Sequence, residues 1–240
     1  MANLKNHFLP CLFSSLLVLF LSACFLNTNK QSEVQRSEAH NGSEQKVILI
    51  HGLGRSEASL LAMQFALERE GFTVSNWGYS SICCTIEEIG QEFADYLADF
   101  QEEDFSEIHF VGHSMGNILV QWAMTHRDLD LTGRFVMLAP PNQGSESADR
   151  YTDWFEWLLP PLPDLQSQNS LATELSGIKD YEVGIIAGRF DGKVTPEEAQ
   201  GIGEKDYREV NAAHTFIMNR PDVHNLTVYF LRNGTFPPKE

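Results

Sequence analysis

The stretch IHFVGHSMGNILVQW, residues 108–122, passes from a strand pattern into a helix pattern within a few residues. Gly112, Ser114 and Gly116 form a G-x-S-x-G at the junction, and we call residues 112–116 the elbow. A serine at the centre of such a turn has a strained backbone and an exposed hydroxyl, and small residues are needed on both sides because side chains there would collide. The motif predicts a nucleophilic Ser114. An ordinary glycine-rich loop with a solvated serine is the alternative.

The sequence around the elbow alternates between short apolar runs and longer amphipathic ones. Runs rich in β-branched and aromatic residues predict six strands, at 46–51, 72–77, 107–113, 134–139, 182–188 and 207–212. Helices are predicted at 56–70, 85–100, 115–127, 196–202 and 222–232, and the second of them has Thr85 as the N-cap of a capping box. This alternation indicates an α/β fold, built on a doubly wound, mostly parallel sheet of six strands.

Two further residues stand where partners of Ser114 are expected. Ligands of an open parallel sheet bind beyond the carboxyl ends of its strands. Asp191 follows the fifth predicted strand and His214 follows the sixth, whereas Asp180 and Asp206 precede strands and belong to the opposite edge. The chain order serine, aspartate, histidine is the one expected for this type of elbow. We therefore predict a catalytic triad of Ser114, Asp191 and His214.

The sequence HGLGR at residues 51–55, which we call the HGLGR loop, follows the first predicted strand. A flexible turn there could aim the backbone N–H of Leu53 at the oxyanion of a tetrahedral intermediate, with the N–H of Met115 as the second donor. A helix-start loop or a phosphate cradle is the alternative, but the loop lacks the lysine of a P-loop and the spacing of GxGxxG. His51 ends the first strand and His113 lies inside the elbow, so both fit the role of base less well than His214.

The N-terminus predicts export. Lys5 precedes an apolar run from Phe8 to Leu21, which is shorter than the about 20 residues of a membrane-spanning helix and is typical of a signal peptide. The run ends in LSAC, which resembles the lipobox of bacterial lipoproteins, with cleavage after residue 23 and a lipid on Cys24. An ordinary secretory signal is the alternative. Residues 24–45 are polar and predict a flexible tether, so the folded domain is expected at 46–240, in the cell envelope on a membrane anchor.

Charge and cysteine content exclude several classes of function. The chain has 17 basic and 33 acidic side chains, and this excess of negative charge disfavours nucleic acid and anionic lipid head groups as partners. There is no CxxC and no Cys/His cluster with zinc spacing, so we expect no metal and no other cofactor. Cys83 and Cys84 are adjacent, and two free, partly buried thiols are slightly preferred here over a vicinal disulfide.

Residues 141–176 interrupt the regular alternation. The segment is too long for a plain connection and contains Trp154, Phe155 and Trp157 beside several prolines. We interpret it as a lid-like or cap-like excursion over the active site, although these residues could also cap the core. Together with Trp77, the three aromatic residues are predicted to contact the acyl part of a substrate.

The joint set of motifs resembles the α/β-hydrolase fold. The sequences IHGLGR, GHSMGN, PPNQGSE, IAGRFDG and AAHTFIM, spread over residues 46–235, are similar to those of small bacterial lipases and esterases related to the GPI inositol-deacylase-like group. The resemblance implies a serine carboxylic-ester hydrolase with the triad and oxyanion positions given above. The chain departs from larger members, whose two additional N-terminal antiparallel strands have no counterpart here.

The predicted function is hydrolysis of a small-molecule or lipid ester with an apolar acyl group, through an acyl-enzyme. An acyltransferase, in which an alcohol replaces water, remains an alternative with the same triad. A non-catalytic binding protein on a hydrolase fold is another, since fold alone does not imply function. Peptidase activity is a weaker alternative, because nothing in the sequence indicates a pocket for a peptide amine.

Overall fold

A computed structural model describes residues 44–102, 105–146, 160–161, 163–165, 181–201 and 203–239. The predicted signal peptide, Cys24 and the tether up to residue 43 lie outside these residues, and so do Trp154, Phe155, Trp157 and most of the 141–176 excursion. The predictions made for them stay predictions. Residue 45, the last of the predicted tether, already belongs to the first strand.

The described residues contain one six-stranded sheet in the order β2-β1-β3-β4-β5-β6, and every neighbouring pair is parallel. The α/β prediction is therefore confirmed, and each strand lies within two residues of its predicted ends. The strands are β1 (Gln45–Ile50), β2 (Thr73–Trp77), β3 (Glu107–His113), β4 (Gly133–Leu138), β5 (Tyr181–Gly188) and β6 (Asp206–Val210).

The helices confirm the predicted order and differ in detail at their ends. The α-helices are α2 (Leu61–Arg69), α3 (Ile86–Ala98), α4 (Met115–His126), α7 (Pro196–Ala199) and α8 (Pro221–Asn233). The 3-10 helices are η1 (Glu57–Leu60), η2 (Asp99–Glu102), η3 (Pro163–Leu165) and η4 (His214–Asn219). The predicted helix 56–70 thus begins as a 3-10 turn, and the one predicted at 196–202 is shorter. No described helix is both long and apolar enough to cross a membrane.

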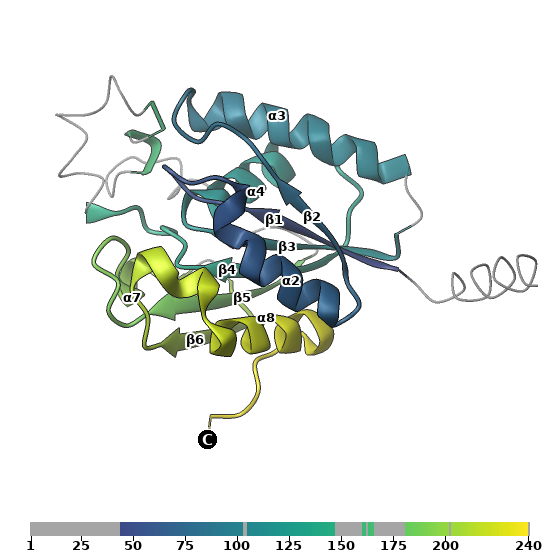
Figure 1. Cartoon of the computed structure of the whole chain (residues 1–240). Helices are drawn as coiled ribbons and strands as arrows, with labels where there is room; N and C mark the ends of the chain where they lie inside the picture. Colours follow the sequence, from purple (N-terminus) through teal and green to yellow (C-terminus); the bar gives the residue numbers. More distant parts are fainter. Residues whose placement is uncertain are drawn as a thin grey trace, which may run out of the picture. The chain divides into compact units, whose positions relative to one another are not determined.

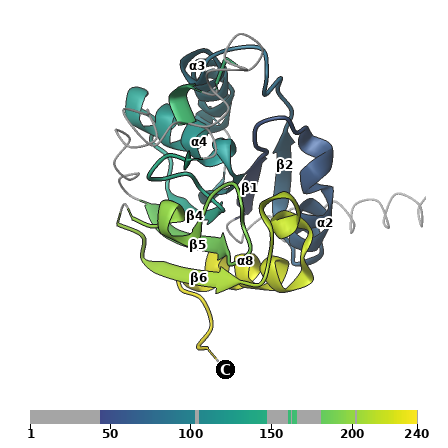
Figure 2. The same ribbon diagram turned by 90° about the vertical axis from the view of Figure 1, so that its left-hand side faces the viewer.

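Helices cover both faces of the sheet (Figures 1 and 2). Successive side chains of a strand point to opposite faces, so Ile108 and Phe110 of β3 pack with α3 and α4, while Val111 packs with α2 and α8. The chain runs outward from β1 to β2 and then returns to β3 on the other side of β1. This reversal creates a switch point between β1 and β3, and ligands of doubly wound sheets bind beyond the carboxyl ends of the strands at such a point.

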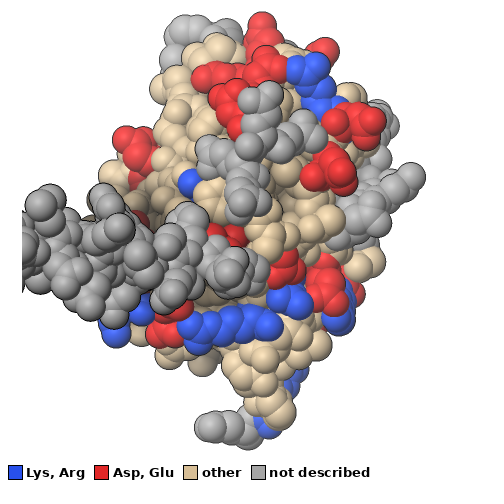
Figure 3. Space-filling view, turned by 90° about the vertical axis from the view of Figure 1, so that its right-hand side faces the viewer, with Lys and Arg blue, Asp and Glu red and all other residues tan. Residues whose placement is uncertain are grey.

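The carboxyl ends of the strands lie on the left in Figure 1 and the amino ends on the right. Figure 3 views the molecule from the right and shows acidic and basic side chains interspersed on that face. One group of ion pairs joins the starts of the last three strands, where Glu182 binds both Arg134 and Lys205. Lys205 is exposed, and an exposed pair of this kind contributes about 1 kcal/mol or less.

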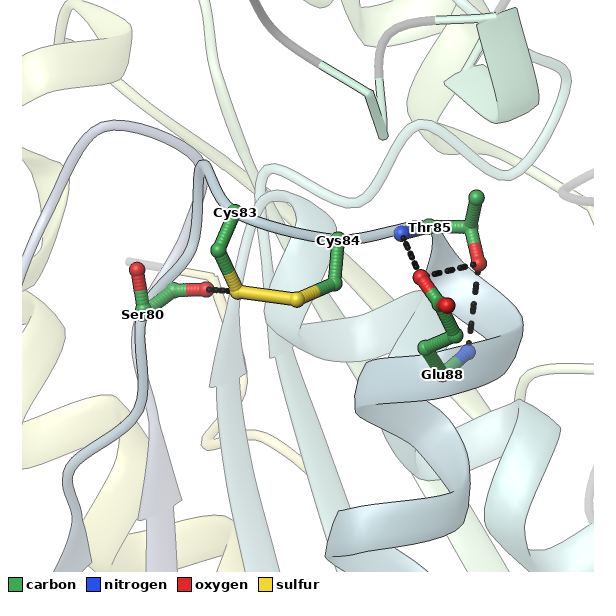
Figure 4. The surroundings of a disulfide bond; sticks show 5 residues. All are labelled: Ser80, Cys83, Cys84, Thr85 and Glu88. Carbon is green, nitrogen blue, oxygen red and sulfur yellow. Dashed lines mark hydrogen bonds between the residues drawn. A yellow bond between two sulfur atoms is a disulfide. The ribbon is translucent and has the colours of Figure 1, made fainter.

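The expectation of two free thiols is wrong in this structure, because Cys83 and Cys84 form a disulfide. The turn between β2 and α3 brings the two sulfurs together, and the disulfide directly precedes the N-cap of α3 (Figure 4). Cys83 is exposed rather than partly buried. The predicted capping box of α3 is confirmed: Thr85 Oγ1 accepts from Glu88 N, and the Glu88 side chain accepts from Thr85 N.

Candidate active site

Ser114 stands at the turn between β3 and α4 with φ 53° and ψ −125°. A positive φ is uncommon outside glycine and costs of order 1–3 kcal/mol, so the surrounding packing has to hold it. Its amide is satisfied, because Ser114 N donates to Leu138 O at 2.9 Å. The serine therefore has the strained backbone that the elbow motif predicts.

The two glycines of the elbow are required by close backbone contacts. A Cβ at Gly112 would lie 2.4 Å from Asn117 Oδ1, across the bend. A Cβ at Gly116 would lie 2.4 Å from Ile50 O, so this glycine lets α4 approach the neighbouring strand β1. Asn117 braces the turn, since its Nδ2 donates to Ser114 O at 2.9 Å and to Leu138 O at 3.3 Å.

The structure brings Ser114, His214 and Asp191 into one hydrogen-bonded series. Ser114 Oγ lies 3.0 Å from His214 Nε2, and His214 Nδ1 lies 2.7 Å from Asp191 Oδ2. A carboxylate only accepts, so Nδ1 carries a proton and Nε2 is left to accept from the serine hydroxyl. The two partners of Ser114 are nearly enclosed, with 8% of His214 and 6% of Asp191 exposed.

The carboxylate of Asp191 is fixed by the loop that carries it. Its Oδ1 accepts from Lys193 N at 2.8 Å and from Val194 N at 2.9 Å, which leaves Oδ2 directed at His214. Gly188 permits the close approach of the segment that follows β6, because a Cβ there would lie 2.7 Å from Ala212 O. The aspartate therefore cannot rotate without losing two backbone hydrogen bonds.

The HGLGR loop lies directly against the elbow. A Cβ at Gly52 would be 2.9 Å from Ser114 Cβ. Leu53 is partly buried against the core, and Met115 is fully buried as the first residue of α4. Among the hydrogen bonds of the described residues, none uses the N–H of Leu53 or Met115 as donor.

Tyr79 supports the HGLGR loop and was not predicted from the sequence. Its hydroxyl donates to His51 O at 2.6 Å, and its ring stacks on His51 with centroids 4.1 Å apart. His51 Nδ1 lies 3.1 Å from Gly52 O, and burial lowers the pKa of this histidine. Nothing local in the sequence marks Tyr79, because its contact is made to a residue 28 positions away.

Trp77 lies at the end of β2 with 7% of its surface exposed. Its ring stacks on Tyr79 with centroids 4.5 Å apart and packs against Phe93 of α3 at 4.6 Å. The structure therefore places Trp77 in the core, behind Tyr79. Its predicted contact with a substrate stays a prediction.

His113, which the sequence places inside the elbow, also contacts the site. It is 1% exposed, and its Nε2 lies 3.0 Å from His214 O. Burial, together with the neighbouring His214, holds its pKa well below the usual range, so the ring is neutral. Within the described residues, no group of three or more His, Cys, Asp or Glu side chains is arranged to hold a metal ion.

Comparison with known proteins agrees with this geometry. Residues 47–224 match the family described as the alpha/beta hydrolase family. None of the curated proteins compared with the chain matches it.

Several solved structures share the fold at low sequence identity. A Bacillus licheniformis lipase, BlEst2 in its mature form, is 18% identical with a TM-score of 0.66, over 82% of this chain and 94% of that chain. A monoacylglycerol lipase from Paleococcus ferrophilus is 17% identical with a TM-score of 0.61, over 80% and 96%. An extracellular alpha/beta-hydrolase from a Paenibacillus species is 17% identical with a TM-score of 0.59, over 79% and 100%. At these identities the likeness concerns the fold.

Proposed function

Because the chain belongs to the alpha/beta hydrolase family, we propose that it is a serine carboxylic-ester hydrolase of the esterase or lipase type. The observation that carries the proposal is the hydrogen-bonded series from the Ser114 hydroxyl through His214 to the Asp191 carboxylate. A serine hydroxyl is a weak nucleophile, and it is activated by an adjacent base that a third group orients. These three residues have the positions that such an activation needs.

In the proposed reaction, Ser114 Oγ attacks the ester carbonyl carbon while His214 Nε2 takes the hydroxyl proton. The tetrahedral intermediate then loses its alkoxy group, which leaves as an alcohol with the proton from His214. Water attacks the acyl-enzyme by the same route, its proton passing to His214, and release of the carboxylic acid restores Ser114. Asp191 keeps the proton of His214 on Nδ1 and stabilises the transient imidazolium.

We assign the N–H groups of Leu53 and Met115 to the oxyanion. The Met115 N–H is at the first position of α4, where helical N–H groups have no partner within the helix and the helix dipole favours negative charge. The Leu53 N–H comes from the HGLGR loop, which contacts Ser114 through Gly52. A donor of this kind lowers the barrier by about 3 kcal/mol in a known hydrolase.

The substrate class proposed is an ester with an apolar acyl chain. Its support is the partly buried Leu53 beside the elbow, together with the aromatic composition of the 141–176 excursion, including Trp154, Phe155 and Trp157. The fold shared with two solved lipases favours the same class. A series of p-nitrophenyl esters of increasing chain length would measure the preferred acyl group.

Replacement of Ser114 by alanine tests the proposed function. We expect Ser114→Ala to lower kcat for p-nitrophenyl esters by about 10⁴-fold or more, and to abolish labelling by a fluorophosphonate probe, because no other group forms the acyl-enzyme. Ser59→Ala is the matched control, since Ser59 is exposed and its hydroxyl donates to the O atom of Ser56, the N-cap of η1. Hydrolysis retained by a folded Ser114→Ala protein would contradict the proposal.

A further inference from the structure

His113 occupies the space between the two loops that carry the proposed machinery. Its side chain lies on the face of β3 toward α2 and α8, shared with Val111 two residues earlier. On one side its ring contacts His214, with centroids 4.9 Å apart. On the other side it meets Gly52, where a Cβ would lie 3.1 Å from His113 Nδ1. One ring thus touches both the HGLGR loop and the loop of the base.

The hydrogen bond to His214 determines the tautomer of His113. Its Nε2 lies 3.0 Å from His214 O, and a carbonyl oxygen only accepts, so Nε2 carries the proton. Nδ1 is then bare, and it has no hydrogen-bond partner among the described atoms. Leaving a buried nitrogen unpaired costs about 1–3 kcal/mol. The bond from Nε2 to His214 O is therefore the hydrogen bond that this ring makes among the described atoms.

The backbone around His214 lies outside the sheet, and the bond from Phe190 N to Ala212 O, at 3.0 Å, holds the chain two residues before it. His214 opens the 3-10 helix η4, whose N-cap, Ala213, provides no side-chain hydrogen bond. The peptide group of His214 lies beyond the last residue of β6, so no sheet ladder holds it. The bond from His113 therefore ties the start of η4 to the end of β3, which is the same chain segment that positions Ser114.

We infer that His113 is a positioning residue for the proposed base: through Nε2–H it holds the main chain of His214, and thereby sets the distance between His214 Nε2 and Ser114 Oγ. The inference rests on the proposed function, since it assigns His214 the role of base. His113 does not exchange protons with the substrate in this scheme. Its neutral ring also leaves its neighbour free to become positively charged during the reaction.

Three substitutions separate this role from a packing role. His113→Phe keeps a ring and removes the N–H donor. His113→Gln keeps a donor, because the glutamine amide nitrogen reaches about as far as Nε2 of histidine. His113→Asn has the same amide on a shorter side chain, which does not reach His214 O. The matched control is His109→Phe, since His109 is also buried on β3, and among the described residues its hydrogen bond is to the backbone of β4, with Glu107 3.9 Å from its other nitrogen.

Steady-state ester hydrolysis and the rate of fluorophosphonate labelling of Ser114 are measured well below the unfolding temperature of every variant. We expect His113→Phe to lower kcat by about 10²-fold with KM changed less than about twofold, as misplacement by about 1 Å does in enzymes. His113→Gln should recover most of kcat, and His109→Phe should lose stability with kcat unchanged.

Each outcome decides whether His113 positions His214 or only fills space in the core. If His113→Phe does not fold, a kcat of His113→Gln at least about tenfold above that of His113→Asn supports positioning, and equal values overturn it. Wild-type kcat in His113→Phe, or an equal loss of kcat in His109→Phe, also overturns it. None of these results contradicts the proposed function. The proposed function fails if the wild-type protein neither hydrolyses esters nor is labelled at Ser114, and the inference about His113 then fails too.

Discussion

His109 and His113 lie on the same face of β3, one near the amino end of the strand and one at its carboxyl end. Both are enclosed, with 0% and 1% of their surfaces exposed, and burial lowers the pKa of both. Each ring uses one nitrogen on a backbone group and leaves the other without a hydrogen-bond partner among the described atoms. The two rings nevertheless hold different parts of the chain.

At the amino end, His109 Nδ1 accepts from Arg134 N at 2.9 Å, which joins β3 to the adjacent strand β4. The ladder of the sheet already joins those two strands, so they stay connected without this bond. At the carboxyl end, His113 bonds to the start of η4, 101 residues away, which no sheet ladder holds. The difference teaches that the sheet is held by many repeated contacts, while the candidate site depends on a few individual ones.

The largest effect on activity is expected at the carboxyl end of the sheet, from replacing the Asp191 oxygen that binds His214. In Asp191→Asn, the amide oxygen is expected to replace Oδ1 as acceptor from Lys193 N and Val194 N, so the NH₂ group faces His214 Nδ1. The imidazole then carries its proton on Nε2 and cannot accept one from Ser114. We expect kcat for ester hydrolysis to fall about 10⁴-fold, with the free energy of unfolding changed little.

Asp95→Asn is the control for this substitution, because Asp95 is exposed and its carboxylate interacts with the surface residues Arg127 and Gln91. It should leave kcat within about twofold of wild type. Loss of an exposed ion pair changes the free energy of unfolding by about 1 kcal/mol or less and does not change the catalytic groups. A loss of less than about tenfold in Asp191→Asn would contradict the proposed role of the Nδ1 proton.

A smaller effect is expected at the amino end, in the dependence of stability on pH. Burial lowers the pKa of His109 to about 4, and the neighbouring charges act in opposite directions, Glu107 raising it and Arg134 lowering it. Between pH 6.5 and 4 the unfolded chain binds a proton that folded His109 does not, so stability falls as the pH falls. The loss from this group approaches roughly 3 kcal/mol near pH 4.

Urea unfolding of wild type and His109→Gln at pH 7 and pH 4.5 measures this contribution. His113 is present in both proteins and acts in the same direction, so only the difference between them belongs to His109. We expect the glutamine variant to lose less stability on acidification. The same loss in both proteins would mean that His109 is not held neutral in the fold.

The smallest effect concerns the close packing of the elbow. In Gly116→Ala, the new Cβ would lie 2.4 Å from Ile50 O and 2.6 Å from His51 O, so α4 or β1 has to shift. We expect a loss of about 2 kcal/mol in the free energy of unfolding, as for other overpacked positions. Gly192→Ala is the matched control at the same edge of the sheet, because a Cβ there meets nothing within 4 Å.

Unfolding of both glycine variants in urea tests the packing argument. Equal stabilities of Gly116→Ala and Gly192→Ala would show that the elbow adapts to an extra methyl group. Activity adds a second readout, since a shift of α4 moves the N–H of Met115, the proposed oxyanion donor, whereas Gly192→Ala should leave kcat unchanged.

Local patterns in the sequence determined the elements and their order. The order of short and long runs located all six strands within two residues. The inner strands are the clearest, because a parallel strand buried on both faces needs a continuous run of apolar side chains, whereas the edge strands β2 and β6 are mostly half-buried and more polar. The Thr85 capping box was predicted because its two hydrogen bonds join residues three apart. Ser114, Asp191 and His214 were selected together because each follows a strand, and parallel strands end at one edge.

Contacts between distant residues were decided only by the tertiary structure. The bond from His113 to His214 O, the support of the HGLGR loop by Tyr79 and the burial of Trp77 behind Tyr79 join segments that no local period relates. The sequence left two states open for the adjacent Cys83 and Cys84, and the structure has them joined in a disulfide. Residue type and spacing indicate which chemical groups are present. The distance between two segments that are far apart in the sequence is set by how the sheet and helices pack. That distance decides which nitrogen of a buried histidine makes a hydrogen bond.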